Sequence, residues 1–155
     1  MPITIDTYGE IDTGKATATQ FAPKPTVPTR MRVLAIDDNE EFCNSLQQLL
    51  EPHGYDVTTY SDPVKALEMY TRDKEDYQLV LLDFYMPNLD GEKTSLWLRK
   101  LNPNVKIIVV SGAEALRLRQ LRAKKLIDDY IRKPFRTEEA LFVIHEVMGQ
   151  PPRLH

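Results

Sequence analysis

Five polar side chains in this chain follow apolar runs of the kind that form buried strands. They are Asp37, Asp38, Asp83, Ser111 and Lys133. Asp83 is the clearest case, because it ends the apolar run at 80–82 and turn-forming residues follow it. Taken alone, such an aspartate is as much a simple turn residue as a functional group. Polar residues at the same position after other strands favour a shared site.

Three carboxylates, a hydroxyl and an ammonium group together suit a metal ion and a phosphoryl group. Acidic side chains within a few ångströms repel each other unless a cation or a proton relieves them. Oxygen ligands favour a hard cation, and Mg²⁺ fits because it takes one or two carboxylates, keeps waters and completes its shell with phosphate oxygen. Lys133 adds a compact positive charge. A carboxylate in this setting can attack a phosphoryl group and form an aspartyl phosphate.

These side chains meet only if strands and helices alternate along the chain. Strands are expected at 31–36, 55–60, 77–82, 105–110 and 126–131. Helices are expected at 39–52, 63–72, 92–101, 113–125 and 137–148. This alternation predicts a parallel sheet covered by helices on both faces. The carboxyl ends of its strands then share one edge, where open α/β sheets keep their ligand sites.

Length and composition fit a single domain with a tail. The chain has 155 residues, and we expect a flexible N-terminal extension at 1–30, the domain at 31–149 and a tail or linker start at 150–155. Residues 3–5 and 8–11 could pair as a short hairpin. The single cysteine, Cys43, cannot form an internal disulfide, which favours a reducing, cytoplasmic location. The net charge of −3 argues against nonspecific nucleic-acid binding, and no apolar run predicts membrane insertion.

In order and spacing, these residues resemble the receiver domain of bacterial-type two-component response regulators. The resemblance covers about residues 31–149. It is carried by Asp37-Asp38, Asp83 with Met86-Pro87 and Asp90-Gly91, Ser111 with Gly112-Ala113, and Lys133-Pro134-Phe135. It implies a flavodoxin-like, doubly wound five-stranded parallel sheet of order 2-1-3-4-5 with five helices.

The resemblance also implies a Mg²⁺ site around the phosphoacceptor. Asp83 would accept the phosphoryl group and contribute to the metal site. Asp38 would bind Mg²⁺ directly, Asp37 would act through metal-bound water, and the backbone carbonyl of Tyr85 would complete the protein ligands. No organic cofactor is expected.

Three further residues would contact or report the phosphoryl group. Lys133 would pair with the phosphoryl oxygens, and the bond between Lys133 and Pro134 would be cis. Ser111 would hydrogen-bond the phosphoryl group and signal its presence. Tyr130, three residues before the lysine, matches the aromatic switch residue, although a half-buried strand aromatic is the plain alternative.

The implied function is a signalling receiver, with only self-phosphorylation and self-dephosphorylation chemistry. A sensor histidine kinase or a histidine phosphotransfer protein would donate to Asp83. The surface formed by residues 113–125, 126–131 and 137–148 would then change for an effector that the sequence does not identify. A non-phosphorylated pseudo-receiver scaffold is one alternative. A haloacid-dehalogenase-like phosphatase is weaker, because it needs a second Asp where this chain has Tyr85.

Two features depart from a plain receiver pattern. Tyr85 stands two residues after Asp83, so we hypothesise that its ring shields the phosphoryl group from water and slows its loss. The helix expected at 113–125 carries a basic set that could dock an acidic partner, although a solvated helix face is the favoured interpretation. This set is Arg117, Arg119, Arg122, Lys124 and Lys125.

Overall fold

The computed structural model describes residues 30–73 and 76–149. Five strands form one parallel sheet: β2 (Met31–Ile36), β3 (Tyr55–Tyr60), β4 (Leu79–Leu82), β5 (Lys106–Ser111) and β6 (Asp129–Arg132). Their order across the sheet is β3-β2-β4-β5-β6, so the expected 2-1-3-4-5 topology is confirmed. The hairpin expected within 3–11 and the tail at 150–155 lie outside the described residues, as does the extension apart from Arg30.

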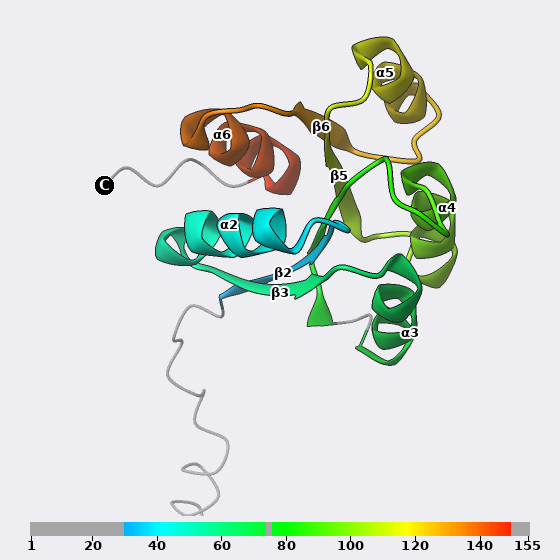
Figure 1. Cartoon of the computed structure of the whole chain (residues 1–155), viewed down its shortest axis with the longest axis horizontal. Helices are drawn as coiled ribbons and strands as arrows, with labels where there is room; N and C mark the ends of the chain where they lie inside the picture. Colours follow the sequence, from blue (N-terminus) through cyan, green and yellow to red (C-terminus); the bar gives the residue numbers. More distant parts are fainter. Residues whose placement is uncertain (1–29, 74–75, 150–155) are drawn as a thin grey trace, which may run out of the picture.

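Helices cover both faces of the sheet, as predicted (Figure 1). One face is covered by α2 (Glu40–Leu50), which continues into the short 3₁₀ helix η1 (Glu51–His53), and by α6 (Thr137–Met148). The other face is covered by α3 (Pro63–Asp73), α4 (Gly91–Leu101) and α5 (Ala115–Ala123). In the described ranges, every helix falls short of the length and apolar character that a membrane crossing needs.

The core has two layers because strand side chains alternate between the faces. Leu34, Val80 and Val109 pack beneath α3, α4 and α5, whereas Val33 and Ile108 pack beneath α2 and α6. All four residues of β4 are buried, which explains why this strand reads as an uninterrupted apolar run. The central strands are thereby held from both sides, and their carboxyl ends are rigid points for a site.

Caps at the helix ends match the sequence signals. The Asn39 side chain accepts a hydrogen bond from the Phe42 N–H at 3.1 Å, and the Asp90 side chain accepts one from Lys93 N–H at 2.9 Å. Gly54 ends η1 in the left-handed conformation at φ 94°, which favours glycine. These two helices, α2 and α4, start directly after the loops that carry Asp37 and Asp83.

The predicted strand at 126–131 was wrong at its start. Lys125 adopts a left-handed φ of 62°, which ends α5, and β6 begins only at Asp129. Leu126 and Ile127 still pack against the core, but from a turn. The Asp128 side chain fixes that turn by accepting a hydrogen bond from the Ile107 N–H at 2.8 Å. The apolar side chains at 126–127 correctly indicated burial, but their backbone is a turn and not a strand.

Candidate functional site

The backbones of the site residues extend the sheet's hydrogen-bond ladder by one step. The Asp37 N–H donates to the Tyr60 carbonyl at 3.1 Å, and the Asp83 N–H donates to the Ile36 carbonyl at 2.9 Å. The Lys133 N–H donates to the Ser111 carbonyl at 3.0 Å. Since the strands beneath are buried, these bonds hold the site residues at fixed positions along one edge.

The three predicted carboxylates come together at this edge. One oxygen from each of Asp37, Asp38 and Asp83 lies within 4.8 Å of the others. Asp37 is 2% exposed and Asp83 is 9% exposed, whereas Asp38 is exposed to solvent. A cluster of oxygen ligands that is buried on one side and open on the other suits a hard cation that retains waters.

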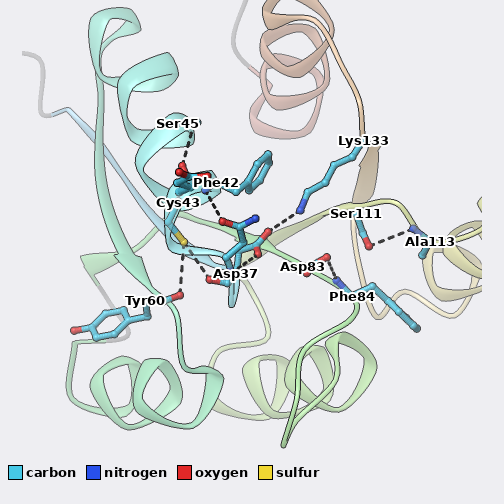
Figure 2. A network of polar contacts seen from close by, with 12 residues as sticks. Asp37, Phe42, Cys43, Ser45, Tyr60, Asp83, Phe84, Ser111, Ala113 and Lys133 are labelled. Carbon is cyan, nitrogen blue, oxygen red and sulfur yellow. Dashed lines mark hydrogen bonds and ion pairs between the residues drawn. The ribbon is translucent and has the colours of Figure 1, made fainter.

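Lys133 is held by a carboxylate and an aromatic ring (Figure 2). Its Nζ donates to Asp37 Oδ2 at 2.8 Å and lies 3.8 Å from the centroid of the Phe42 ring. The Phe42 ring contacts Phe135 edge to face at 6.1 Å. The ammonium group therefore faces the triad with Asp37 as its partner, and the expected cis bond between Lys133 and Pro134 is present.

Asp83 carries its charge at an energetic cost. Burial, and after it the negative charge of Asp37, raises the pKa of the Asp83 carboxyl above its ordinary value. The positive charge of Lys133, a hydrogen bond from the Ser111 hydroxyl and another from the Phe84 N–H at 2.8 Å act in the opposite direction. A cation beside these carboxylates would relieve the remaining repulsion.

Strand alternation divides the site residues between the two layers. Asp37, Asp83 and Lys133 each stand two residues after a side chain of the α2–α6 layer; these side chains are Ala35, Leu81 and Ile131. Ser111 follows the α3–α4–α5 layer instead, and its hydroxyl oxygen accepts a hydrogen bond from the Ala113 N–H at 3.3 Å. Tyr130 is half-buried against the same layer.

The turn after Asp83 is too tight for a side chain at position 91. A Cβ on Gly91 would lie 2.7 Å from Phe84 Cα and 2.9 Å from the Asp83 carbonyl oxygen. The Gly91 N–H donates to the Phe84 carbonyl at 2.7 Å. Gly91 thus lets α4 start directly against the backbone of Asp83.

Tyr85 lies mostly in solvent. Its side chain is 61% exposed, and its ring contacts Phe84 edge to face at 5.0 Å. The exposed ring is free to approach a group on Asp83, so the shielding hypothesis stays a prediction.

Two members of the basic set on α5 contact the domain itself. Arg117 forms an ion pair with Glu92 at the start of α4, and its guanidinium lies 5.8 Å from the Phe84 ring centroid. Arg122 pairs with Asp129 at 2.8 Å and lies 5.4 Å from the Tyr130 ring centroid. Because these two arginines contact other residues of the domain, the face that carries them is not simply solvated.

Sequence reasoning missed three residues that shape the site. Phe42 fitted the apolar spacing of α2 and gave no sign that it faces Lys133. Gly91 was seen only as a turn residue, and Arg117 only as part of a charged face. Of the three, only Phe42 could have been found from the sequence. It lies in the first turn of the helix that follows Asp37-Asp38, so its ring is close to any group that those two carboxylates bind.

A sequence model of the response regulator receiver domain matches residues 33–145. The chain belongs to the response regulator receiver family. Its topology and acidic triad, described above, agree with that membership.

Relatives of this receiver domain are themselves response regulators. Response regulator MprA of Mycobacterium leprae is 36% identical over 118 residues, which are 76% of this chain and 51% of that protein. MprA of Mycobacterium avium is 35% identical over 111 residues, which are 72% of this chain and 48% of that protein. The chain therefore spans about half the length of the curated relatives it matches.

Solved structures show the same fold. A receiver domain protein from Clostridium thermocellum superimposes with a TM-score of 0.71 at 26% identity, covering 77% of this chain and 94% of that one. Response regulator TrrA from Thermotoga maritima, solved in complex with Mg(2+)-BeF, gives a TM-score of 0.67 at 26% identity. That match covers 76% of this chain and 98% of TrrA.

Proposed function

We propose that this receiver domain accepts a phosphoryl group on Asp83 from the phosphohistidine of a sensor histidine kinase or a histidine phosphotransfer protein. The observation that carries the proposal is the buried Asp83 carboxylate beside Asp37, Asp38 and Lys133 at the carboxyl edge of the sheet. Family membership supports the same class of donor.

The residues present fit Mg²⁺. Asp38 would bind it directly from its exposed position, Asp37 through a water, and Asp83 and the Tyr85 carbonyl would supply the other protein ligands. TrrA, which has the same fold, was solved in complex with Mg(2+)-BeF. Bound in the present site, the ion would neutralise negative charge that gathers on the phosphoryl oxygens during transfer.

The transfer step exchanges one bond for another. An Asp83 carboxylate oxygen forms a bond to phosphorus while the P–N bond of the donor breaks, and the imidazole nitrogen keeps the electron pair. Lys133, now 2.8 Å from Asp37, would move its ammonium group to a phosphoryl oxygen. Ser111 would redirect its hydroxyl from the carboxylate to the phosphoryl group.

The signal would leave through α5, β6 and α6. Tyr130 packs against the layer beneath α5, and Ser111 follows that layer at the end of β5. A shift of the Ser111 hydroxyl toward Asp83 would therefore change the packing that Tyr130 meets.

Labelling by a small phosphodonor tests the proposal. The chain should gain one phosphoryl group from acetyl phosphate in the presence of Mg²⁺, detected as a mass increase that alkali or hydroxylamine removes. The variant Asp83→Asn should gain none. Asp56→Asn, which changes a carboxylate at the start of β3 on the opposite edge, should label like the wild type. Labelling of Asp83→Asn at the wild-type rate would refute the assignment.

The same assay separates the alternatives. Absence of both labelling and Mg²⁺ binding would indicate a pseudo-receiver scaffold. Sustained turnover of phosphate esters would indicate a phosphatase, which the exposed Tyr85 at the position of the second aspartate does not favour.

A further inference from the structure

A groove of about 540 Å³ lies between α3 and α4, on the face of the sheet away from α2 and α6. In Figure 1 these two helices lie next to each other at one side of the domain. The apolar side chains that line the groove are Val64, Leu67, Leu89, Trp97 and Leu101. Val64 is 45% exposed and Trp97 is 52% exposed, which is unusual for side chains of this size in a contiguous patch. Nothing in the phosphoryl chemistry requires such a surface.

Outside ion pairs, the two helices that form this groove carry four exposed basic side chains against two acidic ones, Glu68 and Asp73. Lys65 and Arg72 are exposed on α3, and Lys93 and Lys100 are exposed on α4 at helical spacing from Trp97. The ion pairs found in the described part of the chain involve none of these four residues. Glu68 is the one acidic side chain of the lining. The groove thus has an apolar floor and a positive rim in a chain whose net charge is −3.

These charges argue against a second copy as the occupant. A symmetric pair formed through this face would bring two basic rims together, which is unfavourable. The complementary occupant is a segment with apolar side chains and carboxylates. Residues 3–12 of the same chain have that composition, with Ile3, Ile5, Tyr8 and Ile11 among Asp6, Glu10 and Asp12.

We propose that residues 3–12 bind the groove between α3 and α4. Arg30, the first described residue, is attached to the domain through hydrogen bonds to the carbonyls of Glu51 at 2.6 Å and Tyr55 at 3.2 Å. The linking residues 13–29 can span up to about 60 Å when extended, against a radius of gyration of about 13 Å for a domain of this size. The connection makes binding intramolecular, so even a weakly binding segment occupies the groove.

Trp97 offers a direct readout, because it is the single tryptophan of the chain and lines the groove. Acrylamide quenching of Trp97 fluorescence is compared between the 155-residue wild-type chain and its double variant Ile3→Asn/Ile5→Asn, which removes apolar side chains without adding charge. The matched control is Thr17→Asn/Thr19→Asn, which places the same amide side chains in the linking residues. We expect the quenching constant to rise about threefold in the first variant and to stay unchanged in the control.

Binding in trans identifies the occupant. A synthetic peptide of residues 1–12, added to the Ile3→Asn/Ile5→Asn protein, should restore the protection of Trp97, and 1 M NaCl should weaken it by screening the rim. Equal quenching of wild type and variant overturns the proposal. So does protection that persists in the variant and grows with protein concentration in parallel with dimers in sedimentation, because a second copy would then be the occupant.

Discussion

Replacing Gly91 by alanine would place a methyl group against the backbone that carries Asp83. The new Cβ would lie 2.7 Å from Phe84 Cα and 2.9 Å from the Asp83 carbonyl oxygen, where ordinary contacts begin at 3.4 Å. Both neighbours are backbone atoms, so neither can rotate away. The start of α4 or the phosphoacceptor loop has to move by about half an ångström or more, a shift of the kind that overpacking forces on a well-packed core.

The cost follows from packing and helix propensity. Overpacking of a rigid site costs about 1–3 kcal/mol, and alanine returns less than about 1 kcal/mol at the first position of a helix. We therefore expect Gly91→Ala to lower the free energy of unfolding by about 1–2 kcal/mol and Tm by about 4–8 °C for a domain of this size. Displacement of the Asp83 carbonyl should also slow labelling by acetyl phosphate.

Gly112→Ala is the matched control. It lies in the loop after β5, and nothing is within 4 Å of the added Cβ. Urea unfolding and labelling rates of the two variants are measured side by side. A stability of Gly91→Ala within about 0.5 kcal/mol of the wild type, the range of an ordinary surface substitution, would refute the close-approach argument.

Four further predictions concern the site and its supports. Without Mg²⁺, Asp83→Asn should stabilise the domain by about 1 kcal/mol in urea at pH 7, because it removes a charge that is buried and that Asp37 also repels. Since the pKa of Asp83 is raised, this gain should disappear as the pH falls toward 3.8, and a gain that persists there would contradict the prediction. Asn39→Ala should cost about 1 kcal/mol in the same assay, since α2 loses its cap, and an unchanged midpoint would count against that role. Burial, with the charge of Asp37, raises the pKa of the Cys43 thiol from 9.0 to about 11. The unfolded thiol therefore ionises first, and wild type should lose about 2 kcal/mol more than Cys43→Ala between pH 9 and 11, so parallel curves would rule out the shift. Tyr85→Ala should shorten the half-life of the phosphorylated chain severalfold in a phosphate-release assay, and an equal half-life would discard the shielding hypothesis.

Much of the fold could be predicted from the sequence because buried parallel strands leave a strong apolar signature. The runs ending at Ile36 and Leu82 located the strands, and the polar residues behind them located the edge that holds the triad. Helix signals at Asn39 and Gly54 were equally local and equally reliable. Each of these features depends on neighbours within a few residues in the chain.

What escaped prediction depends on contacts between distant segments. The partner of Lys133 is Asp37, 96 residues earlier, and the aromatic face beneath its ammonium group belongs to Phe42. Spacing could assign Lys133 to the site but could not choose its partner. The late start of β6 has a similar cause, because Asp128 is held by the Ile107 N–H from another strand.

The two-layered core has a consequence for how variation in this receiver would affect a signal. Asp37 and Lys133 are supported by the layer beneath α2 and α6, whereas Ser111 and Tyr130 are supported by the layer beneath α3, α4 and α5. Under the proposed function, residues of the first layer set how fast Asp83 is phosphorylated. Residues of the second layer set how far the output surface changes once Asp83 is phosphorylated. Since the sheet separates the layers, evolution can retune the sensitivity of this switch and the strength of its output one at a time.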